Sequence, residues 1–162
     1  MKKGISIWSF PAEPLSKCFA LAKDAGFEGV EVALDEAGEV SLAASEKQLC
    51  HVANMAKDSG IELYSVASGL YWANWLTADD AKERERAKDI VKRHLEVAAV
   101  LGCDTILVVP GSVNAEFAMP GRVVDYKSAY LRAYEALTEL KSEAERMRVS
   151  IGIENVWNKF LT

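Results

Sequence analysis

The sequence has 162 residues, 50% of them hydrophobic and 27% charged, a composition typical of one globular domain with a sizeable core. The formal net charge is −5, and the lysines and arginines are mixed with acidic residues, so neither nucleic acid nor a membrane surface is an expected partner. The three cysteines show no C-x-x-C spacing, which predicts neither a zinc site nor a disulfide framework and favours a cytoplasmic location.

Strand and helix patterns alternate along the whole chain. Runs of β-branched and apolar residues predict strands at about residues 5–10, 28–34, 61–67, 104–109 and 149–154. Apolar residues at helical spacing predict four helices between them: one starting at Pro14, one capped by Ser45, one over Asp80–Leu101 and one over about Asp125–Met147. In the last helix, Tyr130 and Tyr134 are predicted to face inward.

This alternation predicts a single α/β domain over residues 1–162 with parallel strands and right-handed crossovers. Two architectures share the pattern. One is the first five strands and four helices of a (β/α)8 TIM barrel, with strands six to eight absent; the other is an open five-stranded doubly wound sheet. The loop after the first strand, SFPAEP, carries no glycine-rich phosphate motif. The long irregular stretch 111–124 follows the fourth strand, at the end where α/β proteins usually bind ligands.

The last predicted strand ends in a carboxylate. Because side chains alternate along a strand, Glu154 shares a face with Ser150 and Gly152 and lies at the carboxyl-end rim, where barrel enzymes hold their catalytic groups. A carboxylate there is costly to desolvate unless it is paired, protonated or bound to a metal. Glu154 is therefore either a functional group or one partner of a buried ion pair. Glu31 repeats the pattern lower in the second strand, where a structural ion pair is the favoured interpretation.

Other candidate binding residues lie at strand ends, and each has an ordinary structural alternative. They are Trp8, Ser68, Asn155 and Asn158. Trp8 is equally compatible with core packing, and serine and asparagine are common at turns. Trp72 and Trp75 could form a lid after the third strand or pack beneath that loop. His94 is predicted to be a core histidine and His51 to be solvated.

Three segments resemble a known family: FEGVEVAL after a helix-ending AG, LGCDTILVVPG, and IGIENVWNKF. They are similar to the xylose-isomerase-like TIM barrels, and within these to the sugar phosphate isomerase/epimerase group of ketose 3-epimerases, L-ribulose- and L-xylulose-5-phosphate 3-epimerases and hydroxypyruvate isomerase. The resemblance covers the whole chain, and I-x-I-E-N is its most specific part. It implies that Glu154 is a ligand of one divalent ion (Mn²⁺, Co²⁺ or Mg²⁺) and one of two carboxylates that move a proton on a ketose.

The resemblance also implies that the site is incomplete, because the other ligands (an Asp, a His and a second Glu) belong to strands six to eight. We therefore expect a truncated portion of a metal-dependent sugar or sugar-phosphate isomerase/epimerase that binds metal weakly and does not catalyse. Phe160 stands near where some free-sugar epimerases carry a further glutamate, which weakens a free-hexulose assignment. The alternative is a non-catalytic half-barrel assembly module, and self-association through open faces or edges is expected. An endonuclease IV-like nuclease is disfavoured, because it needs many histidines and a basic surface.

Overall fold

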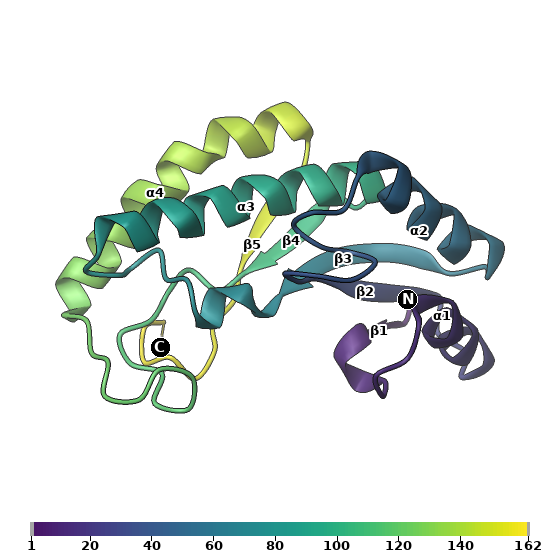
Figure 1. Cartoon of the computed structure of the whole chain (residues 1–162), viewed down its shortest axis with the longest axis horizontal. Helices are drawn as coiled ribbons and strands as arrows, with labels where there is room; N and C mark the ends of the chain where they lie inside the picture. Colours follow the sequence, from purple (N-terminus) through teal and green to yellow (C-terminus); the bar gives the residue numbers. More distant parts are fainter. Residues whose placement is uncertain (1, 162) are drawn as a thin grey trace.

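Five strands and four α-helices alternate along residues 2–161, the part of the chain that the computed structural model describes (Figure 1). Two short 3-10 helices, η1 and η2, follow the first and third strands. The elements are β1 Gly4–Ser6, η1 Ile7–Ser9, α1 Leu15–Asp24, β2 Gly29–Leu34, α2 Glu46–Asp58, β3 Glu62–Ser68, η2 Gly69–Trp72, α3 Ala81–Leu101, β4 Thr105–Val108, α4 Tyr126–Met147 and β5 Ser150–Ile153.

The sheet order decides between the two predicted architectures. The strands are all parallel and lie in the order β1-β2-β3-β4-β5. A doubly wound sheet reverses its strand order at a switch point, and this sheet does not. Right-handed crossovers between sequential neighbours place every helix on the same side of the sheet, and Figure 1 shows α3 and α4 lying along one side of the strands. The arrangement is that of a partial TIM barrel, as predicted.

Local sequence signals set the helix starts. Ser45 caps α2 with a full capping box: its side chain accepts from the Gln48 amide, and the Gln48 side chain accepts from the Ser45 amide at 2.8 Å. Asp80 caps α3 and Asp125 caps α4, and each side chain accepts a hydrogen bond from a backbone N–H of the first turn. These ends confirm the predicted helices.

The core lies between the outer face of the sheet and the helices. On β2, Val30, Val32 and Leu34 are fully buried against the helices, as the alternation predicts. The predicted first strand over 5–10 is wrong in its second half, because pairing with β2 ends at Ser6 and the chain turns into η1. Trp8 therefore lies in a 3-10 turn beyond the strand and is exposed.

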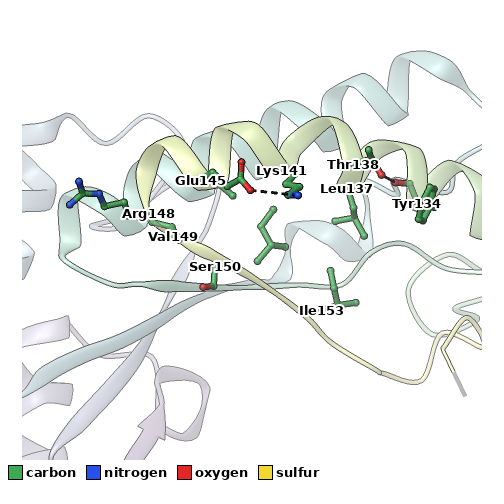
Figure 2. A pocket seen from close by; sticks show the side chains of 11 residues that line it. Tyr134, Leu137, Thr138, Lys141, Glu145, Arg148, Val149, Ser150 and Ile153 are labelled. Atoms are coloured by element: carbon green, nitrogen blue, oxygen red, sulfur yellow. Dashed lines mark hydrogen bonds and ion pairs between the residues drawn. The ribbon is translucent and has the colours of Figure 1, made fainter.

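One face of α4 is not covered within the described chain. Tyr130 and Tyr134 were predicted to face inward, and this is wrong: they are 51% and 63% exposed. The reason is that α4 packs on α3 with its other side, where Ala129, Ala133 and Ala136 are buried. Beyond it, α4 and β5 border an open groove of about 790 Å³ (Figure 2).

None of the described helices is both long and apolar enough to cross a membrane.

Candidate functional site

Glu154 lies directly after β5, at the carboxyl end of the sheet. Its backbone N–H donates to the Val108 carbonyl at 3.0 Å, which extends the β4–β5 pairing to this residue. The side chain is half-buried, and among residues 2–161 no lysine, arginine or histidine forms an ion pair with it. The structural alternative, a carboxylate held by a cation on a neighbouring strand, has no counterpart in the described chain.

A second carboxylate, Glu31 on β2, lies near enough to Glu154 for its charge to act on it. Burial raises the pKa of Glu154, and the negative charge of Glu31 on β2 raises it further. The Ser65 hydroxyl donates to Glu31 at 2.8 Å. The ion pair favoured for Glu31 is likewise not found among residues 2–161. The fold therefore brings the charge of Glu31 close enough to act on Glu154, although the two residues are far apart in sequence.

Two of the predicted binding residues already use their polar atoms within the protein. The Ser68 hydroxyl donates to the Leu34 carbonyl at 2.9 Å and accepts from the Leu70 amide at 3.2 Å, so it caps η2. Asn158 is fully buried, donates to the Gly111 carbonyl at 2.6 Å and accepts from the Phe160 amide at 3.1 Å. Both residues hold loops, and a sugar contact by either stays a prediction. Asn155, in contrast, is exposed beside Glu154.

The loop 111–124 is fixed to the third βα connection, which the sequence did not predict. Arg122 forms a bidentate pair with Glu83 on the first turn of α3, with both contacts at 2.9 Å. Its guanidinium also stacks 4.0 Å from the centre of the Trp75 ring. Trp75 is fully buried and packs beneath the loop, so it is not a lid residue. A lone arginine in an irregular segment gives no sequence signal for this contact.

Aromatic side chains from three loops meet near the carboxyl-end rim. The ring centre of Phe117 lies 4.8 Å from that of Trp72 and 6.5 Å from that of Trp157, both edge to face. Trp157 follows Glu154 by three residues and is 86% exposed. The arrangement joins the segments that follow β3, β4 and β5 through one aromatic cluster. Trp72 was a candidate from the sequence, whereas Phe117 was missed because its loop has no periodic pattern.

A buried histidine holds the third βα connection in place. His94 Nε2 lies 2.9 Å from the Val66 carbonyl, and its Nδ1 lies 2.9 Å from the Tyr71 hydroxyl. Because a carbonyl only accepts, Nε2–H donates to Val66 and the Tyr71 hydroxyl donates to Nδ1. Burial lowers the pKa of His94 to about 4. The prediction of a core histidine is confirmed, and His51 is exposed as predicted.

The described residues do not complete a metal site. Among residues 2–161 no group of three or more His, Cys, Asp or Glu side chains is arranged to hold an ion. Mg²⁺ and similar divalent ions take about six oxygen ligands, so Glu154 and Glu31 alone are too few. Their oxygens are nevertheless of the type that such ions prefer.

These features define a class of protein: an incomplete parallel barrel with an unpaired carboxylate at its carboxyl-end rim. A family model described as "Xylose isomerase-like TIM barrel" matches residues 19–162. The chain belongs to this family, as its sequence motifs predicted. Among curated proteins, none matches the chain.

The solved structures that match the chain include several ketose 3-epimerases. D-psicose 3-epimerase crystallised in the presence of D-fructose superposes with a TM-score of 0.82 at 23% identity, covering 99% of this chain and 55% of that one. D-psicose 3-epimerase from Clostridium cellulolyticum H10, with D-tagatose, gives 0.79 at 20% identity, with 99% and 55% covered. L-ribulose 3-epimerase gives 0.75 at 20% identity, with 96% and 50% covered. These likenesses establish the fold, and the chain spans about half the length of the solved structures it matches.

Proposed function

We propose that this chain forms the first half of a metal-dependent sugar or sugar-phosphate isomerase/epimerase barrel, with Glu154 as a functional carboxylate. The observation that supports this proposal is the half-buried Glu154 at the end of β5, whose pKa is raised and which has no cationic partner in the described chain. A structural carboxylate in such a place is normally paired. The epimerases with the same fold support the class of reaction.

The chemistry of that class is proton transfer at a carbon next to a carbonyl group. A carboxylate with a raised pKa is a stronger base than an ordinary one, which suits it to take a proton and, once protonated, to return it. Glu31 contributes by its charge, since it favours the protonated form of Glu154. A bound divalent ion (Mn²⁺, Co²⁺ or Mg²⁺) would supply charge stabilisation for an enediolate, and Glu154 would be one of its ligands.

The chain by itself is expected to bind metal weakly and not to catalyse, because it supplies too few ligands. Mn²⁺ binding to the 162-residue protein, followed by the EPR signal of the free ion, should give a Kd on the order of 1 mM. Glu154→Gln should weaken this binding about tenfold, since it removes the anionic ligand. Glu46→Gln, at an exposed position in the first turn of α2, is the matched control and should change nothing.

Two outcomes would contradict the proposal. One is Mn²⁺ binding that Glu154→Gln and Glu46→Gln affect equally. The other is robust Mn²⁺-dependent conversion of D-psicose to D-fructose by the isolated chain, which would show that strands six to eight are not needed for the site.

A further inference from the structure

We propose that Glu83 and Arg122 are positioning residues, which fix the loop after β4 so that its Phe117 side chain stays against Trp72 in the aromatic cluster. Barrel enzymes build their active sites from the loops at the carboxyl end of the sheet, so the place of this loop helps to set the shape of the site. The significance for catalysis rests on the proposed function. The positioning itself depends only on contacts that residues 72–124 make with one another.

The loop over residues 113–124 is an Ω-loop that is closed by its own hydrogen bonds. At its base the Val124 amide donates to the Val113 carbonyl at 2.8 Å, so the two ends of the loop lie side by side. Further along, the Asn114 side chain donates to the Arg122 carbonyl at 3.0 Å. Because these bonds tie the two arms of the loop together, we expect the loop to move as one unit.

Glu83, in the first turn of α3, connects this loop to the segment that follows β3. Its Oε1 accepts from the Trp75 amide at 3.0 Å and from Arg122 Nη1 at 2.9 Å, and its Oε2 accepts from Arg122 Nη2 at 2.9 Å. Both side chains of the ion pair are only 22% exposed. Bidentate, charge-assisted hydrogen bonds are strong and directional, so the pair fixes the orientation of the guanidinium as well as its distance.

The ion pair lies next to the aromatic cluster. The Arg122 guanidinium stacks on the buried Trp75 ring, and the indole N–H of that ring donates to the Trp72 carbonyl at 2.9 Å. The ring of Phe117 lies edge to face against the ring of Trp72, with 4.8 Å between the ring centres. Glu83 therefore holds both sides of this contact: the segment after β3 through an amide, and the loop after β4 through the arginine.

The base of the loop is fixed separately, without Glu83. The Ser112 amide donates to Thr77 Oγ1 at 2.9 Å, and the Thr77 hydroxyl donates to the Ser112 carbonyl at 2.8 Å. Loss of the Glu83–Arg122 pair should therefore free the outer part of the loop, which carries Phe117, and leave its base in place. The expected effect is a local change at the aromatic cluster and not unfolding.

Fluorine NMR of the 162-residue chain, labelled with 5-fluorotryptophan, tests this, because each of the four tryptophans gives its own signal. The signals of Trp8, Trp72 and Trp157 are assigned by single replacement with phenylalanine, and the remaining signal belongs to Trp75. Phe117→Leu removes the ring that packs against Trp72 and so defines the position of the Trp72 signal when this contact is lost.

Glu83→Gln should move the Trp72 signal toward its position in Phe117→Leu, because a neutral glutamine cannot hold Arg122 in a bidentate ion pair. Arg122→Gln breaks the same pair from the loop side and should give the same change. In a Phe117→Leu background, Glu83→Gln should produce no further shift of the Trp72 signal.

Glu85→Gln is the matched control, since it removes one negative charge from the same helix and its ion pair is with Lys88 of that helix. It should leave the Trp72 signal in place, and circular dichroism checks that every variant is folded. The signals require neither a metal nor a sugar. A failure of this proposal is therefore distinguishable from a failure of the proposed function, which the Mn²⁺ measurement on Glu154 tests.

A Trp72 signal that keeps its wild-type position in both Glu83→Gln and Arg122→Gln would overturn the proposal, because the ion pair would then contribute to stability without placing Phe117. A shift by Glu83→Gln that is equally large in the Phe117→Leu background would also overturn it, since Glu83 would then act on Trp72 without the loop.

Discussion

Acid should destabilise this protein through His94, a side chain that no proposed function uses. Burial lowers its pKa from 6.5 to about 4, whereas in the unfolded chain the imidazole has its ordinary value. Between these two pH values the unfolded state binds a proton that the folded state does not. The stability contribution is therefore fully present above pH 6.5 and is lost as the pH falls toward about 4.

The size of this loss follows from the two pKa values. Each pH unit between them corresponds to about 1.4 kcal/mol of unfolding free energy, so the protonation of His94 removes about 3 kcal/mol in total. Solvent screening does not reduce this free energy, because the His94 side chain is fully buried. A loss of this size is a large share of the stability of a typical domain, which is about 5–15 kcal/mol.

Urea unfolding followed by tryptophan fluorescence, at several pH values from 8 to 4, measures this directly. His94→Gln keeps a donor for the Val66 carbonyl and an acceptor for the Tyr71 hydroxyl, and it does not titrate. The difference in unfolding free energy between wild type and this variant should shift by about 3 kcal/mol in favour of the variant as the pH falls. Carboxyl groups common to both proteins cancel in that difference.

His51→Gln is the matched control, since His51 is exposed on α2. It should leave the pH dependence of wild type nearly unchanged. A pH dependence that His94→Gln does not reduce, or that His51→Gln reduces as much, would refute the assignment of the effect to the buried histidine.

Two further substitutions test the inner face of the sheet. Glu154→Gln should raise the unfolding free energy at neutral pH, because the raised pKa of Glu154 means that folding disfavours its charged form. This gain in stability should shrink as the pH falls and Glu154 becomes protonated. A Glu154→Gln variant that is less stable than wild type at neutral pH would contradict this reasoning. Gly29→Ala should cost about 1–2 kcal/mol in urea unfolding, because the new methyl group would lie 2.4 Å from ring atoms of Tyr64. In a Tyr64→Ala background the same change should cost nothing, and an equal cost in both backgrounds would show that the ring is not the cause.

The sequence predicted the local structure well where the signal depends on neighbouring residues. The capping box of Ser45 and the apolar alternation of Val30, Val32 and Leu34 both operate within a few residues of the chain. The predicted first strand is longer than the observed β1, and the reason lies in its pairing with a neighbouring strand. Ile7 is apolar enough for a strand, but β2 pairs only with residues 4–6, and the remaining residues turn away as η1.

The candidate site was predicted only in part. The position of Glu154 at a strand end follows from the alternation within one strand. That Glu31 raises the pKa of Glu154 depends on how far the sheet curves between β2 and β5, and no local pattern encodes this. Asn158 shows the same limit: its sequence context suits a turn or a ligand contact, and only the approach of Gly111 fixes it as a buried loop anchor.

The sequence by itself determined the order of elements, their caps, the family and the carboxylate at the end of β5, because these depend on short-range periodicity and short motifs. Only the tertiary structure decided which face of each helix or strand packs against another element. Tyr130 and Tyr134 have the spacing of core residues, yet they are exposed because α4 packs on α3 with its alanine face and nothing described covers the other side. An apolar stripe indicates that one face of a helix is suited to pack against another element. Only the tertiary structure shows whether an element of the described chain covers that face.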